Sequence, residues 1–313
     1  MVQQLNSKIL LFGEYAILHD GMALVIPFDK YHGRFEFNKA GENDTIALQS
    51  NEYLKKFCSF ISSRMDEKFV LEVKKFEQEL NQGLFFRSNI PQGYGLGSSG
   101  AIVAAIVLRY LVKAKNLKDE MKVLTLQKIR ELKSSLGDLE SFFHGVSSGL
   151  DPLSSILNEP ILCKSSQDIV TTTLPKSSLN SNNVVFLLDT KTPRTTAKMM
   201  ERFKELYSDE SFKRKFDNYI YEDNNEAIES FLSSDLETFY QSISDISAFQ
   251  LEHMSDFFPP HLIKDIKSGL SNGDFFLKLC GAGGGGFILG FTREWEVTKE
   301  KLKNFNLEEI YCY

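Results

Sequence analysis

The sequence predicts an α+β fold organised in two domains. The 313-residue chain opens with strand-like segments, continues with helix-like segments, and carries strand-like runs at both ends of its second half. Strands and helices that are grouped in this way, and do not alternate, are typical of α+β folds. The length suits two domains of ~100–200 residues each. We place the boundary near residue 180, which gives domains 1–180 and 181–313.

The first half is expected to be mostly β at its start and helical after a glycine-rich loop. Apolar runs bounded by turn residues, and alternating apolar residues further on, predict strands at 8–18, where Gly13 breaks the run, and at 22–28, 33–38, 69–76 and 84–90. After Pro91 and Gly93, a helix should begin at Ser98 or Ser99 and run to about Ala114. It is apolar on nearly all sides, so we expect it to be buried. Two more helices are expected at 119–134 and 138–144.

The second half follows a serine-rich stretch, residues 164–183, which we expect to hold an edge strand and the connection between the domains. Strands are then expected at 184–189, 275–279, 286–291 and 308–313. Helices should fill the chain between the first two of these strands, to about residue 270.

Composition argues against several classes of partner. The formal net charge of −6 does not favour nucleic-acid binding. The four cysteines have no C-x-x-C spacing, the histidines have no zinc-binding spacing, and the first residues do not resemble a signal peptide. The apolar stretch 101–112 contains Arg109 and is shorter than the ~20 residues that span a bilayer. We therefore expect a cytoplasmic protein without membrane or nucleic-acid partners.

Two glycine-rich segments, "GLGSSG" at 95–100 and "GAGGGG" at 281–286, match the spelling of a dinucleotide-binding turn. The first does not directly follow a strand, and the acids about 20 residues later lie in a helix-like segment, which disfavours that interpretation. No lysine follows either segment, so a Walker loop is absent. The remaining interpretation is a phosphate-binding loop at a helix N-terminus, with an ordinary loop and helix cap as the alternative.

The segment "PQGYGLGSSGA" (91–101) resembles the phosphate loop P-x-x-x-G-L-G-S-S-A of the GHMP kinases, a superfamily of small-molecule kinases. Four further segments resemble motifs of the same family and occur in the family's order: "SKILLFGEYAILHDG" (7–21), "HGVSSGLDP" (144–152), "DTKTPRTTAKM" (189–199) and "LKLCGAGGGGFILGF" (277–291). The segment "DTKTPRTTAKM" (189–199) is similar to mevalonate kinases in particular. The resemblance implies an N-terminal domain like ribosomal protein S5 and a ferredoxin-like C-terminal domain.

The resemblance also implies ATP and Mg²⁺ as cofactors and assigns roles to individual residues. Asp151 aligns with the catalytic aspartate, and Lys8 with the lysine beside it. Glu140 and Ser99 align with the magnesium ligands. The nucleotide-binding residues would be Gly93, Gly95, Leu96, Gly97, Ser98 and Ser99. Taken without the family, an aspartate before a proline is also a common turn or cap residue, and Glu140 a common surface acid.

The acceptor-binding residues that the resemblance implies come from three segments. They are Glu14, Tyr15, His19, Arg194, Thr195, Thr196, Gly281, Ala282, Gly283 and Gly284. Glycines would let the backbone approach the substrate, and the arginine and hydroxyls would meet a carboxylate. The alternatives for these segments are a flexible hairpin and a helix cap.

The acceptor implied by the resemblance is the primary hydroxyl of mevalonate, phosphorylated to phosphomevalonate with release of ADP. Gly13-Glu14-Tyr15 looks more like phosphomevalonate kinases, whereas mevalonate kinases usually have histidine at the position of Tyr15. Gly100 stands where the family has alanine, and Cys280 where it has threonine; the first change is expected to be tolerated. Phosphomevalonate kinase, another GHMP kinase and a catalytically silent ligand-binding paralogue remain alternatives. A homodimer also stays open.

Overall fold

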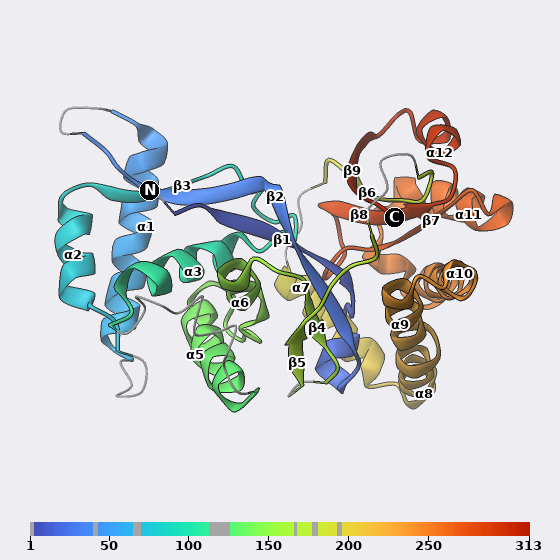
Figure 1. Ribbon diagram of the computed structural model, residues 1–313, viewed down its shortest axis with the longest axis horizontal. Coiled ribbons are helices and arrows are strands. Elements are labelled where there is room, and N and C mark those ends of the chain that lie inside the picture. The colour runs from blue at the N-terminus through green and yellow to red at the C-terminus, as the bar shows by residue number, and fades with distance from the viewer. Residues whose placement is uncertain are drawn as a thin grey trace. The chain divides into compact units, whose positions relative to one another are not determined.

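The structure is a computed structural model that describes residues 3–39, 43–64, 70–112, 126–165, 168–176, 181–192 and 196–313. It is an α+β fold with two sheets, as the sequence predicts (Figure 1). The chain forms two compact units, each assembled from separate segments: residues 1–8, 27–91 and 96–159 form the first, and residues 9–26, 92–95 and 160–313 the second. The boundary near residue 180 stays a prediction, and residues 177–180 lie outside the described ranges.

The first sheet has five strands among the described residues. They are β1 (Leu5–Phe12), β2 (Ala23–Phe37), β3 (Leu84–Ser88), β4 (Ile161–Cys163) and β5 (Ile169–Thr171), in the order β1-β2-β4-β5 with β3 also paired to β2. β5 is the edge strand expected in the serine-rich stretch. The strands expected at 22–28 and 33–38 are one strand, because Gly33 makes no turn: it pairs with Ser88 and leaves room for the Phe86 ring.

Five helices are described in the first unit. They are α1 (Thr45–Ser62), α2 (Val73–Asn81), α3 (Ser98–Tyr110), α5 (Leu126–His144) and α6 (Leu150–Leu157). α1 and α2 lie side by side, and α3 packs against both α5 and α6 (Figure 1). α3 is buried over most of its length, as its apolar composition predicts. The packing of α3, α5 and α6 positions Ser99, Glu140 and Asp151, three of the site residues that the sequence predicts.

Two expectations about this unit are wrong. Over its described residues, 70–76, the predicted strand is not formed, because Val73 begins α2, whose buried Phe76 and Leu80 have the four-residue spacing of a helix face. The helices expected at 119–134 and 138–144 are a single helix from Leu126, and residues 119–125 lie outside the described ranges. Gly137 does not interrupt this helix. A side chain there would lie 2.8 Å from the Ser147 carbonyl oxygen, so the glycine permits close packing.

The second unit contains an antiparallel sheet at the predicted positions. Its strands are β6 (Val184–Asp189), β7 (Phe275–Leu279), β8 (Phe287–Thr292) and β9 (Asn306–Cys312), in the order β7-β8-β6-β9. Every residue of β7 and β8 is buried. The apolar runs that predict these strands therefore reflect burial on both faces of the sheet.

Helices lie between β6 and β7 and after β8. The α-helices are α7 (Thr196–Tyr207), α8 (Glu210–Tyr219), α9 (Asn225–Ser233), α10 (Leu236–His253), α11 (Ile263–Asn272) and α12 (Trp295–Lys301). Short turns of helix are η1 (Ala16–His19), η3 (Ile220–Asn224), η4 (Ser255–Phe257) and η5 (Pro260–Leu262). α10 and α11 pack on β7, and α9 lies beside α10 (Figure 1). No helix in the described ranges has both the length and the apolar character needed to cross a membrane.

Candidate active site

Lys8 and Asp151 form an ion pair in the first unit. The Lys8 Nζ lies 3.0 Å from Asp151 Oδ1, and the side chains are 8% and 31% exposed. Lys8 is held in β1, and its backbone N–H donates to the Leu96 carbonyl at 3.1 Å. Asp151 lies in the first turn of α6, where the helix dipole favours a carboxylate. The structure therefore brings together the two residues that the sequence predicts for catalysis.

The predicted phosphate loop has a backbone that only glycine adopts readily. Gly93, Gly95 and Gly97 have φ angles of 76°, 78° and 74°, in the left-handed region. Gly97 is the N-cap of α3, and its lack of a side chain leaves that helix N-terminus without a side-chain cap. A helix N-terminus with this geometry is suited to bind phosphate oxygens. Ser98 and Ser99 form the first turn of α3, as predicted.

Glu140 is buried beside two serine hydroxyls. Ser99 Oγ donates to Glu140 Oε1 at 2.9 Å, and Ser147 Oγ donates to the other carboxylate oxygen. Burial, and after it the charge of Asp151, raise the pKa of Glu140 to about 7, although hydrogen bonds from Ser147 and Ser99 act to lower it. Ser99 and Glu140 are thus in contact, as the predicted metal ligands should be.

The donor set around Glu140 fits a magnesium ion. Mg²⁺ prefers oxygen ligands and is commonly held by one or two carboxylates together with substrate phosphates and water. Glu140 supplies a carboxylate and Ser99 a hydroxyl beside the phosphate loop. Among the described residues no group of three or more histidine, cysteine, aspartate or glutamate side chains is arranged for a metal. A site with few protein ligands, completed by a nucleotide, agrees with both observations.

Glu14, a predicted acceptor-binding residue, lies in a buried ion pair of the second unit. Lys278 Nζ donates to Glu14 Oε1 at 2.6 Å, and both side chains are 1% exposed. The same ammonium also donates to the carbonyl oxygens of Leu11 and Leu279, each at 3.0 Å. All three N–H donors of Lys278 are therefore used inside the protein. Burial raises the pKa of Glu14, against the opposing effect of Lys278.

Tyr15 and His19 pack against aromatic residues of α7. The Tyr15 ring stacks on Phe203 with centroids 4.1 Å apart, and its hydroxyl donates to the Ala282 carbonyl at 2.6 Å. The ring centroid of His19 lies 3.8 Å from that of Tyr207. Burial lowers the pKa of His19, which favours the neutral imidazole. Tyr15 thus connects two of the predicted acceptor-binding segments within the second unit.

The glycine-rich segment 281–286 is fixed by backbone hydrogen bonds. Five of its six residues are glycines with positive φ, as a chain that lies close to other backbone requires. Gly284 N–H donates to the Phe257 carbonyl at 2.6 Å, and Gly286 N–H to the Thr192 carbonyl at 2.7 Å. The segment is therefore an ordered loop, and the flexible hairpin considered from the sequence does not describe it. Thr196 begins α7, whereas Arg194 and Thr195 lie outside the described ranges.

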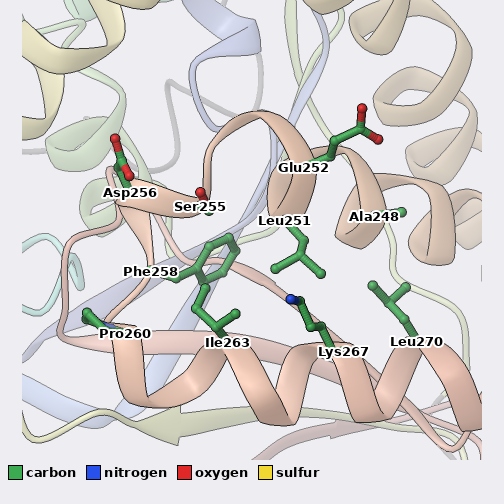
Figure 2. Close-up of a pocket in the computed structure, with 10 residues that line it drawn as sticks. All are labelled: Ala248, Leu251, Glu252, Ser255, Asp256, Phe258, Pro260, Ile263, Lys267 and Leu270. Carbon is green, nitrogen blue, oxygen red and sulfur yellow. The ribbon is translucent and has the colours of Figure 1, made fainter.

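A surface hollow of about 940 Å³ lies elsewhere in the second unit, among α10, η4, η5 and α11 (Figure 2). Leu251, Phe258 and Ile263 form its apolar lining, and Lys267 projects from α11 towards it. None of the residues that the sequence predicts for catalysis or binding lines this hollow. We therefore assign it no part in the candidate active site.

Two residues of these clusters are absent from the sequence-based prediction. Ser147 lies in the segment that contains Asp151, but a serine in a Ser-Ser-Gly turn gives no separate signal for contact with Glu140. Lys278 does give a signal, because it is a charged residue in the middle of an apolar strand, "FFLKL". A lysine in such a strand requires a buried partner.

Comparison with known proteins supports the family resemblance. Residues 56–158 match the family model described as GHMP kinases N terminal domain. This match covers the phosphate loop, Glu140 and Asp151. A comparison with curated protein sequences finds no significant match.

Solved structures with the same fold include mevalonate kinases and a phosphomevalonate kinase. The mevalonate kinase of L. major, in complex with R-mevalonate, is 19% identical, with a TM-score of 0.65 over 100% of this chain and 97% of the other. The Methanococcus jannaschii mevalonate kinase is 19% identical, with a TM-score of 0.61 over 100% and 98%. The Streptococcus pneumoniae phosphomevalonate kinase, in complex with phosphomevalonate and AMPPNP, is 16% identical, with a TM-score of 0.59 over 99% and 100%. The chain thus has a GHMP kinase fold, and mevalonate kinases are among the structures most similar to it.

Proposed function

We propose that this chain, whose residues 56–158 match the GHMP kinase N-terminal domain, is an ATP-dependent kinase that phosphorylates the primary hydroxyl of mevalonate. The observation that carries the proposal is the 3.0 Å contact between Lys8 and Asp151 next to the phosphate loop. An alcohol has a pKa far above 7, so its attack on a phosphate is helped by a group that accepts its proton. A carboxylate paired with an ammonium suits that task.

Each residue of the first unit has a defined task under this proposal. Asp151 accepts the proton of the acceptor hydroxyl, and Lys8 holds the carboxylate in place and stabilises the developing negative charge. The first turn of α3 binds the ATP phosphates through backbone N–H groups. Glu140 and Ser99 would hold Mg²⁺, which supplies neutralisation of the phosphate charge when bound.

The acceptor-binding residues remain a prediction from the sequence resemblance. A direct role suits His19 and the segment 281–284, which include partly exposed residues, better than Glu14, whose carboxylate is enclosed with Lys278. The part taken by Tyr15 is indirect, because its hydroxyl is bound to Ala282 and its ring to Phe203. We accordingly propose that Tyr15 shapes the segment 281–284 and that this segment contacts the acceptor.

Phosphomevalonate is the second candidate acceptor. The Gly13-Glu14-Tyr15 sequence favours it, and a phosphomevalonate kinase is among the structures with the same fold. A phosphate oxygen is already anionic at neutral pH, so it needs no base and would be repelled by Asp151. The Lys8–Asp151 pair therefore favours an alcohol acceptor.

The deciding experiment is an assay of ADP release with the purified full chain, ATP and Mg²⁺. Mevalonate, phosphomevalonate and galactose are offered separately, and each product is identified by mass spectrometry. ADP release that requires mevalonate supports the proposal. Turnover of phosphomevalonate alone would transfer the assignment to the second candidate. Nucleotide binding without turnover of any of the three acceptors would refute the proposal in favour of a kinase of another acceptor or a catalytically silent paralogue.

A further inference from the structure

Gly100 lies directly against the backbone of Asp151. A β-carbon on Gly100 would be 2.7 Å from the Asp151 carbonyl carbon and 2.8 Å from both the Asp151 Cβ and the Pro152 nitrogen. All three atoms belong to the backbone or its first side-chain atom, which cannot rotate away. Helices α3 and α6 can therefore be this close only because residue 100 has no side chain.

Gly97 lies against both side chains of the ion pair. A β-carbon there would be 2.9 Å from Lys8 Cγ, 3.1 Å from Lys8 Cε and 3.5 Å from Asp151 Oδ2. Gly97 also has a φ of 74° and is the N-cap of α3. One turn of the phosphate loop and its helix thus covers Lys8 and supports the backbone of Asp151.

We propose, on the basis of the function proposed above, that Gly97 and Gly100 are positioning residues for the Lys8–Asp151 pair. The missing side chain of Gly100 sets the separation of α3 and α6, and that of Gly97 leaves room for the side chains of the ion pair. Together they set the geometry of the proton acceptor. Gly100 is the position where the sequence departs from the alanine of the family motif. The observed position of Asp151 in this chain therefore requires glycine at residue 100, and alanine cannot replace it without a shift of the backbone.

Gly100→Ala tests this proposal, because the two hypotheses predict opposite changes in the melting temperature. Gly100 has helical backbone angles, and alanine is a better helix former than glycine. If Gly100 had no role in packing, the substitution would raise the melting temperature. If the glycine sets the spacing of α3 and α6, the substitution should lower the melting temperature and move Asp151. A displacement of about 1 Å can reduce turnover by roughly 10²-fold.

Gly269→Ala is the matched control. Gly269 is also a buried helical glycine, and its β-carbon would be 2.4 Å from the Phe275 carbonyl oxygen. It lies in α11 of the second unit, so it reproduces the steric conflict away from the ion pair. We expect both variants to melt at lower temperature. Only Gly100→Ala should lose kcat by about tenfold to 100-fold, with a smaller change in the KM for ATP.

Crystal structures of the parent and both variants give a measurement that does not depend on the acceptor. In Gly100→Ala we expect the contact of Lys8 Nζ with the Asp151 carboxylate to be lost, and in Gly269→Ala we expect it to be kept. If Gly100→Ala does not fold, Gly97→Ala replaces it, because its β-carbon would meet only side-chain atoms of Lys8 and Asp151. The φ of 74° at Gly97 adds backbone strain in the phosphate loop, so the KM for ATP is measured for this variant as well.

A Gly100→Ala variant that melts at a higher temperature, turns over at the parent rate and retains the ion pair would overturn the positioning role. A parent chain that phosphorylates no acceptor would instead refute the proposed function. The crystal structures would still decide the positioning role in that case.

Discussion

Lys278 and Glu14 form an ion pair that is sealed from solvent, with 2.6 Å between Nζ and Oε1 and 1% exposure of each side chain. The lysine is in β7, two residues before Cys280, and the glutamate follows β1. The ammonium also lies 5.4 Å from the centroid of the Phe12 ring. The pair joins two segments that are 264 residues apart in the chain. Glu14 is itself a predicted acceptor-binding residue, and Lys278 precedes the predicted acceptor-binding segment 281–284.

Removing one partner of this pair should be costly. Lys278→Met leaves the Glu14 carboxylate in an apolar environment, which typically costs about 3–5 kcal/mol of unfolding free energy. Replacing both, as Lys278→Met with Glu14→Leu, should recover much of that loss because no buried charge remains. Urea unfolding of the parent, single and double variants measures both effects. Lys299→Met, which removes an exposed partner of Glu296, is the control and should change stability little. A single variant as stable as its control would contradict the role of the buried pair.

Asp151→Asn should reduce turnover of mevalonate by about 10²–10⁴-fold, the usual contribution of a general base. ATP affinity should change little, because the amide keeps the size of the side chain and the phosphate loop is intact. Lys8→Met should also lose activity. Asp138→Asn, an exposed aspartate of α5, is the control. Steady-state kinetics and calorimetric ATP titration measure the two quantities separately. Near-parental turnover in Asp151→Asn would show that the base is another group.

The sequence predicts the parts of this fold whose signals are local. The runs at 184–189 and 275–279 are strands with the expected bounds, because an uninterrupted apolar run is the signature of a strand buried on both faces. α3 begins at Ser98 after three glycines with positive φ. Asp151 is in the first turn of a short helix, as its position after a Ser-Ser-Gly turn suggests.

The remaining features depend on contacts between distant residues. Phe76 and Leu80 lie on one face of α2, but the overlapping segment also alternates well enough to suggest a strand. Gly137 lies inside α5 without ending it, and its lack of a side chain lets the backbone of Ser147 and Gly149 lie against the helix. The contact of Ser147 with Glu140 likewise requires α5 and the turn before α6 to pack together. The last two contacts join α5 to the turn before α6, so the pattern within either segment alone does not predict them.

Glu140→Gln and Ser99→Ala should weaken magnesium-dependent use of ATP without loss of the fold. Glu140→Gln replaces the carboxylate with a neutral amide, and Ser99→Ala removes the hydroxyl oxygen, while both leave the side chain nearly the same in size. When ADP release is titrated with magnesium, both variants are expected to need a higher magnesium concentration for half-maximal turnover. Asp138→Asn removes an exposed carboxylate two residues away and serves as the control. Titration curves that overlay the parent curve would refute the metal assignment.

Asp223 gives a prediction about pH and stability. It lies in η3, and its pKa is raised from 3.8 to about 6, first by burial and then by the charges of Asp245, Glu222 and Glu226. Below pH ~4 the carboxyl is protonated in both the folded and the unfolded chain, so it has no effect on stability. Between pH 4 and 6 the unfolded chain ionises first, and the free energy of unfolding falls as the pH rises. Above pH 6 the loss is constant.

Asp223→Asn removes this titration, so the variant should be more stable than the parent at pH 7 and equal to it below pH 4. Asp245→Asn removes the neighbouring charge with the largest effect on the pKa of Asp223, so it should narrow the pH range over which stability changes. Urea unfolding of all three proteins between pH 4 and pH 7 measures these differences, and a parent–variant difference that does not change with pH would refute the assignment.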